Sequence, residues 1–356
     1  MLANTILTLS GNSSSYSGNI SIGTATTTAA GILKINGNAN ALGATSGTTT
    51  INTGSALQLE GGLAFAAEPT TISGTGINND GVIRNLTGSN SYSGPITLGG
   101  DSRINTDAGT LTLTSTATIN TTANAYSLTI GGTTNLTASG IISGNGSLTK
   151  DGASTLFLNA ENTYAGLTTI SNGIVQVQKS NALGSLNAGT GTSNTIVSNG
   201  AAIQIFGTNI NIPEAISVYG TGISNGGVIR NFTGSTGVNV LSNTITLNSA
   251  SRINVDAGSL SMTSSTAIAT NTYPLNLGAN GSTFMSVSGA ITGSGDLTKD
   301  STGTLYVSGN NSSYSGAITV YKGVMNIQNS DALGTTDVAT SVLTNGALQM
   351  QGGITV

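Results

Sequence analysis

The stretch that decides the fold is residues 148–184, LTKDGASTLFLNAENTYAGLTTISNGIVQVQKSNALG. Apolar and polar residues alternate in it: one residue separates Leu156 from Leu158, and one separates Val175 from Val177. A period of two places alternate side chains on one buried side of a strand. Similar short bursts, bounded by Gly, Asn, Ser and Asp, recur along the whole chain. The sequence therefore predicts many short β-strands joined by tight turns and no sustained helix.

Parts of this stretch return at long intervals. The segment SRINTDAG at 102–109 recurs as SRINVDAG at 251–258, which is 149 positions later. The segment LTKD at 148–151 recurs at 297–300 after the same interval. The chain thus holds two and a half copies of a super-repeat of about 149 residues. We place the copies at about 1–147, 148–296 and 297–356.

A finer repeat lies inside each copy. Sets of strand bursts recur at roughly 20–25 residues, which is the period of a solenoid turn made of three short strands and three turns. Stacked turns lie about 4.8 Å apart and bury their aliphatic side chains only against their neighbours. We predict one continuous parallel β-helix (β-solenoid) over residues 1–356, with about 15–17 coils. An array of β-sandwiches is the alternative, and it would require longer strands and repeats of about 100 residues.

Composition excludes several classes of protein. The 356 residues include no Cys, His or Trp, so a Ser-His-Asp triad, a Cys-His nucleophile and the usual zinc sites are excluded. The 9 basic residues form no cluster and are outnumbered by 13 acidic ones, which argues against nucleic-acid binding. No run of 18 apolar residues is present, so we expect no transmembrane segment. A mean hydropathy of +0.14 argues against disorder.

The stretch at 148–184 resembles the autotransporter-associated β-strand repeat, which has the shape LTKxGxGTLxLxGxNTYxGxTxIxxGxLxV…ALG. A second resembling copy starts at Leu297, and a partial one starts at Ile6 and includes Tyr16-Ser17-Gly18. Proteins of that family are passenger regions of bacterial autotransporters and related surface proteins. The resemblance implies a right-handed β-helix at the bacterial cell surface or in the extracellular space.

The acidic residues are candidates for a catalytic site because many parallel β-helices cleave polysaccharides. Asp107 and Asp256 each begin an Asp-Ala-Gly segment, which resembles the paired Asp-Thr-Gly of aspartic proteases. A dyad needs its carboxylates about 3 Å apart, whereas copies one super-repeat apart are expected roughly 30 Å apart. We expect instead local turn ion pairs, Arg103 with Asp107 and Arg252 with Asp256.

Other candidate residues recur in the same way or stand alone. Arg84/Arg230, Lys150/Lys299 and Asp151/Asp300 recur at equivalent places, which is typical of structural turns and not of a single active site. The unrepeated set Glu60, Glu68 and Asp80 is a weak candidate for a glycan-cleaving site.

We interpret the tyrosines of the recurring Tyr-x-Gly setting as caps of the core edge, with sugar stacking as the alternative. These are Tyr16, Tyr92, Tyr164 and Tyr314. Asn residues near turns are expected to form hydrogen-bonded ladders between coils.

These observations predict a non-catalytic structural rod, stalk or filament segment of a bacterial surface or secreted protein, with adhesion as an additional role. We expect no catalytic residue, no cofactor-binding residue, no cofactor and no metal site. As partners we expect either a second copy joined head to tail into a fibre or flanking coils of a longer chain, and a cell-surface or glycan ligand. The alternative function is a polysaccharide-binding or polysaccharide-cleaving β-helix, that is, a lyase or hydrolase.

Overall fold

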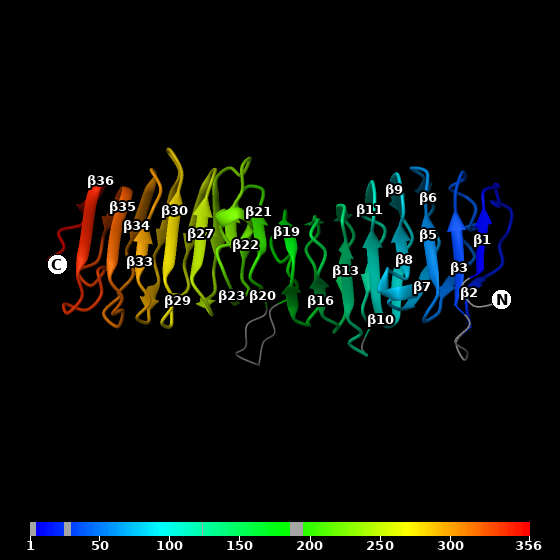
Figure 1. The fold of residues 1–356 in the computed structure, drawn as a ribbon, viewed down its shortest axis with the longest axis horizontal. Helices are drawn as coiled ribbons and strands as arrows, with labels where there is room; N and C mark the ends of the chain where they lie inside the picture. The colour runs from blue at the N-terminus through cyan, green and yellow to red at the C-terminus, as the bar shows by residue number, and fades with distance from the viewer. Residues whose placement is uncertain (1–4, 25–29, 123, 186–194) are drawn as a thin grey trace. The chain divides into compact units, whose positions relative to one another are not determined.

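The computed structural model describes residues 5–24, 30–122, 124–185 and 195–356. They form an all-β parallel β-solenoid with about 14 turns, close to the 15–17 expected. The chain divides into two compact units, Met1–Thr169 with Gly173–Val175 and Ile170–Asn172 with Gln176–Val356. Figure 1 labels strands of both units. The expected continuity of one solenoid over the whole chain stays a prediction.

Three ladders of parallel strands build unit 1, and the chain visits them in turn. β10 (Ile96–Thr106) bends over a corner, so that its two halves belong to two of the ladders. The first ladder contains β1 (Thr5–Leu9), β3 (Gly31–Ile35), β5 (Ala56–Leu59), β8 (Ile83–Asn85), the end of β10, β13 (Leu128–Gly132) and β16 (Leu148–Lys150). The second contains β2 (Ile20–Ile22), β4 (Thr49–Ile51), β7 (Thr70–Gly74), the start of β10, β12 (Ile119–Asn120) and β15 (Ile142–Ser143). The third contains β6 (Ala64–Phe65), β9 (Ser89–Tyr92), β11 (Thr110–Leu113), β14 (Leu136–Ala138) and β17 (Thr155–Leu158).

Unit 2 repeats the three-ladder plan. The first ladder contains β21 (Ala201–Ile205), β24 (Ile229–Asn231), β27 (Ser251–Val255), β30 (Leu275–Ala279), β33 (Leu297–Lys299) and the start of β35 (Ile318–Ile327). The second contains β22 (Asn211–Ile212), β25 (Val238–Leu241), β28 (Ser259–Met262), β31 (Phe284–Val287), β34 (Thr304–Val307) and the end of β35. The third contains β20 (Thr195–Val197), β23 (Ile216–Val218), β26 (Ile245–Leu247), β29 (Thr266–Ala269) and β32 (Ala290–Thr292).

The remaining elements are few. β36 (Thr340–Met350) pairs along the length of β35, and β18 (Thr168–Ile170) and β19 (Gly173–Val177) contain the division between the units. Two short 3₁₀ helices, η1 (Ile77–Asn79) and η2 (Ile223–Asn225), occupy corners. Among the described residues, no helix is long and apolar enough to cross a membrane.

The core follows from the alternation seen in the sequence. In β3, Leu33 and Ile35 are buried while Lys34 points outward, and the pairing places Leu33 beside Leu57 of β5 and Leu57 beside Ile83 of β8. Like side chains therefore stack on one another from coil to coil. Each such buried Leu or Ile contributes about 1.5–3 kcal/mol relative to an exposed one.

Candidate functional site: charged clusters on the first ladder

Five charged residues of unit 1 meet beside the outward side of the first ladder. Arg84 of β8 donates from Nε to Asp107 Oδ2 at 2.5 Å and from Nη1 to Asp80 Oδ2 at 2.9 Å. Arg103 of β10 donates from Nη1 to Asp151 Oδ2, also at 2.5 Å. We call these five residues, with Asn105, the charged cluster of unit 1. In it, every arginine is paired with a carboxylate of another coil.

Asn105 joins the two halves of this cluster. Its Oδ1 accepts a hydrogen bond from Arg103 Nη2 at 3.2 Å, and its Nδ2 donates to Asp107 Oδ1 at 2.6 Å. Asn105 is paired in register with Arg84 on one side and with Gly131 on the other. The cluster therefore continues across consecutive coils as one hydrogen-bonded column.

Gly131 is the residue over which Arg103 reaches Asp151. A Cβ at position 131 would collide with both the Arg103 guanidinium and the Asp151 carboxylate. The ion pair spans 48 positions of sequence, so it forms only when the coils on either side of Gly131 are stacked. The missing side chain at 131 is what leaves room for it.

Replacing Gly131 with alanine should lower the free energy of unfolding by up to about 1 kcal/mol, because the added methyl group displaces the partly exposed ion pair of Arg103 with Asp151. Gly100→Ala is the matched control, since a Cβ there would make only ordinary contacts with Ser73. Urea denaturation of both variants checks this. Equal stabilities for the two would contradict the assigned role of Gly131.

Unit 2 builds the same cluster from the equivalent residues. Arg230 donates to Asp256, and Arg252 donates to Asp300. Asn254 accepts from Arg252 Nη2 at 3.1 Å and donates to Asp256 Oδ1 at 2.7 Å. We call these five residues the charged cluster of unit 2. Gly278 leaves room for the Arg252 side chain here, since a Cβ at position 278 would collide with Asn254 and Arg252. Where unit 1 has Asp80, the Arg230 guanidinium instead lies 5.1 Å above the ring of Phe232.

The prediction of local ion pairs was wrong, both for Arg103 with Asp107 and for Arg252 with Asp256. Both arginines bind the aspartates that follow the Leu-Thr-Lys strands, and Asp107 and Asp256 bind Arg84 and Arg230. The reason is geometric: four positions along an extended strand cover about 13 Å, whereas neighbouring strands lie about 4.8 Å apart. Side chains on a solenoid therefore meet across coils more readily than along one.

The carboxylates weighed as catalytic are each held inside structural contacts. Asp107 and Asp256 are bound by an arginine and an asparagine of their own cluster, an arrangement unlike two carboxylates sharing a proton. Glu60 binds Lys34 at 3.1 Å, Asp80 binds Arg84, and Glu68 accepts from Thr49 Oγ1 at 2.8 Å. Within the described residues, no group of three or more acidic side chains is placed to hold a metal ion.

Lys150 and Lys299 are core residues, whereas their recurrence predicts residues of structural turns. Both point inward beside the cluster, with 1% and 0% of their surface exposed. Lys150 Nζ donates to Gly152 O, and Lys299 Nζ donates to Ser301 O and, at 3.0 Å, to Lys322 O. Burial lowers the pKa of each to about 8, against the opposing effect of the adjacent aspartate. The alternation Leu-Thr-Lys was the available signal, since it places Lys on the same side as the buried Leu.

Glu68 and Glu214 are a second recurring pair of buried ionisable groups, 146 positions apart. Burial raises the pKa of Glu68, an effect that the Thr49 hydrogen bond reduces. Burial raises the pKa of Glu214 to about 8, and neither its Oε1 nor the hydroxyl of Thr195 has a hydrogen-bond partner. At neutral pH Glu214 is therefore mainly an uncharged acid.

Three of the four tyrosines cap the core as interpreted from the sequence. Tyr92, Tyr164 and Tyr314 are at most 1% exposed, and their hydroxyls bond to Thr70, to Thr168 and to Gly295 O. Tyr16 differs, because 49% of its surface is exposed.

The expected asparagine ladders tie neighbouring coils together, partly through backbone groups. Asn90 Nδ2 donates to Asn85 Oδ1 at 2.6 Å, and Asn85 Nδ2 donates at 2.8 Å to Ala108 O on the next coil. Asn90 Oδ1 accepts at 2.6 Å from the backbone N–H of Leu63 on the preceding coil. These side-chain amides thus form hydrogen bonds with backbone groups at the corners, where the strand ladders provide no partner.

Comparison with known proteins agrees with this architecture. Residues 148–177 and 297–327 match the passenger-associated transport repeat, so the chain carries two such repeats of the autotransporter passenger type. Proteins with this repeat are secreted or lie at the cell surface. No curated protein and no solved structure matched the chain.

Proposed function

We propose that the chain is a non-catalytic structural segment of a bacterial cell-surface or secreted protein, acting as a stalk, spacer or filament segment. The observation that carries the proposal is that both charged clusters join coils within a unit. In both clusters the arginines form ion pairs with the aspartates. The side chains that could act in catalysis therefore hold neighbouring coils of the solenoid together. The two passenger-associated transport repeats support the surface location. Head-to-tail self-association and glycan adhesion stay predictions.

The location is tested with antibodies raised against the purified chain. Intact cells of the source bacterium, or their culture medium, should react without permeabilisation. Signal that appears only after permeabilisation would contradict the surface or secreted location.

The absence of catalysis is tested by incubating the chain with a panel of acidic and neutral polysaccharides. We expect no new reducing ends and no unsaturated products above a buffer control. Turnover that disappears in both Asp107→Asn and Asp256→Asn would overturn the structural assignment in favour of a lyase or hydrolase. Because these substitutions also weaken the clusters, circular dichroism must first show that each variant is folded.

A further inference from the structure

A shallow hollow of about 400 Å³ lies on the outward side of the second ladder of unit 2. Val238 of β25 and Phe284 of β31 form two of its walls, and Ser259 of β28 lies between them. The register gives this order, because Val238 pairs with Ser259 and Ser259 pairs with Phe284. Two strand spacings, about 10 Å, therefore separate the two apolar walls.

Phe284 presents an aromatic ring at the surface. It is 36% exposed, and Tyr306 of the neighbouring strand β34 packs against it. The two ring centroids lie 5.7 Å apart and the ring planes meet at 82°, which is the edge-to-face arrangement that aromatic pairs favour. The Tyr306 ring thus holds the Phe284 ring in place, so that the Phe284 ring loses little conformational freedom when a ligand binds.

Ser259 forms the floor of the hollow. It lies on the outward side of β28, because Leu260 next to it and Met262 point into the core. It is nevertheless only 6% exposed, since Val238 and Phe284 flank it. Its hydroxyl forms no hydrogen bond with any residue that the structure describes. A serine hydroxyl both donates and accepts, so this one is available to a bound ligand.

The equivalent positions of unit 1, which come 149 residues earlier, are all polar. They are Ser89, Thr110 and Asn135, and each of the three is exposed. The two apolar walls and the covered serine are therefore features of unit 2 alone among these equivalent positions. Features that recur in both units are typical of the stack itself, whereas an unrepeated surface feature is typical of a binding site.

The lining of the hollow indicates the chemistry of a ligand. None of the described residues that line it is charged, and Ser282 and Thr283 add two further hydroxyl residues at its edge. The negative face of an aromatic ring attracts polarised C–H groups, and hydroxyls exchange hydrogen bonds with other hydroxyls. A neutral sugar ring carries both kinds of group. The net charge of −4 of the chain further disfavours acidic glycans.

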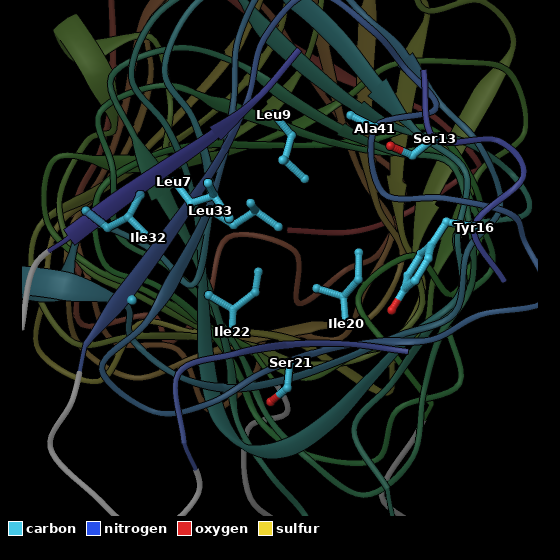
Figure 2. A pocket seen from close by; sticks show the side chains of 11 residues that line it. Leu7, Leu9, Ser13, Tyr16, Ile20, Ser21, Ile22, Ile32, Leu33 and Ala41 are labelled. Atoms are coloured by element: carbon cyan, nitrogen blue, oxygen red, sulfur yellow. The ribbon is translucent and has the colours of Figure 1, made fainter. Parts of the chain in front are cut away.

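The cavity beside β1 in unit 1 has a different character. Figure 2 shows side chains such as Leu9, Ile22 and Leu33 surrounding it, with the ring of Tyr16 at one side. Its volume is about 250 Å³ and its lining is mainly aliphatic. Such a lining is typical of a protein core, whereas the hollow of unit 2 combines an aromatic ring with hydroxyl groups.

We propose that the hollow of unit 2 binds one neutral pyranose ring of a glycan. One face of the sugar lies against the Phe284 ring and its far edge lies against Val238, while its hydroxyls exchange hydrogen bonds with Ser259 and Ser282. A volume of about 400 Å³ lies within the range of small-ligand sites. The proposal rests on the surface or secreted location proposed above, because glycans are accessible there.

Affinity electrophoresis of the full chain tests the proposal. Each native gel contains one soluble polysaccharide: dextran, galactomannan or xyloglucan as neutral probes, or polygalacturonate as an acidic one. We expect at least one neutral polysaccharide to slow the chain with a saturable dependence on its concentration, and polygalacturonate to leave the migration unchanged. The purified chain is used, so a negative result overturns the glycan site and leaves the location to the antibody test.

Three variants locate the site. Phe284→Asn introduces the residue type that unit 1 has at the equivalent position, and it should weaken binding by at least about tenfold. Ser259→Ala should weaken it by about threefold, because one hydrogen bond is lost. Tyr321→Asn is the matched control, at an aromatic residue that is 56% exposed and outside the hollow, and it should leave binding unchanged.

Circular dichroism must first show that each variant is folded. Three results would overturn the proposal: no retardation by any of the neutral polysaccharides, equal retardation of Phe284→Asn and the wild type, or an equal loss in Tyr321→Asn. Binding to a phenyl resin that depends on Phe284, without retardation by a polysaccharide, would also overturn it, in favour of an apolar segment of a protein partner.

Discussion

Replacing Lys299 with alanine should destabilise unit 2 by about 3 kcal/mol. The side chain is fully buried, so its removal leaves a cavity in the stack, and two backbone carbonyls, Ser301 O and Lys322 O, lose their donor. Urea denaturation followed by circular dichroism measures the loss. Lys150→Ala should produce a similar change in unit 1.

Two further variants separate the effect of the cavity from the effect of the lost hydrogen bonds. Lys322→Ala removes an exposed lysine of the neighbouring strand and should change the free energy of unfolding by less than about 0.5 kcal/mol. Lys299→Met retains most of the buried volume without the ammonium group, so its remaining loss reports the hydrogen bonds to the carbonyls. If Lys299→Ala were no more harmful than Lys322→Ala, the core placement of Lys299 would be wrong.

Glu214 should make the protein less stable as the pH rises from about 4.5 to about 8. Its folded pKa of about 8 lies above the ordinary value of 4.5, so in this window the folded state binds a proton that the unfolded state has released. A difference of this size corresponds to about 3–5 kcal/mol. Glu68, whose pKa is raised in the same direction, adds to the trend.

The buried lysines act in the opposite sense at higher pH. Their folded pKa of about 8 lies below the ordinary 10.5, so between these values the unfolded state binds more protons and stability rises with pH. The free energy of unfolding should therefore pass through a minimum near pH 8. Glu214→Gln should remove much of the fall below that minimum and leave the rise above it. A Glu214→Gln profile that matches the wild type from pH 5 to 8 would contradict the burial of an uncharged Glu214.

The strands and their inward sides could be read from the sequence because the alternation of period two is local. The pattern alone places Leu156 with Leu158, and Val175 with Val177, on one buried side of a strand, and all four side chains are buried in the structure. The recurrence of Leu-Thr-Lys-Asp likewise marked the repeat that the family comparison matched. Such features need only neighbouring residues, so one sequence is enough to find them.

The pairing of charges could not be read in this way, because it depends on which coils are adjacent. Arg103 and Asp151 are 48 positions apart, and the number of residues per coil varies too much for the sequence alone to fix their contact. The role of Gly131 is hidden for the same reason, since it depends on an arginine from another coil. Glu68 and Glu214 could have been found as a recurring pair, but their burial depends on the corner that covers them.

The central claim is that the recurring charged residues hold stacked coils together. A double-mutant cycle on Arg103 and Asp151 tests it most directly, with Arg103→Met, Asp151→Asn and the double variant compared by urea denaturation. The account predicts a coupling free energy of about 1–3 kcal/mol, because the pair is partly buried and each partner is costly to leave alone. A coupling free energy of zero in folded variants would contradict it.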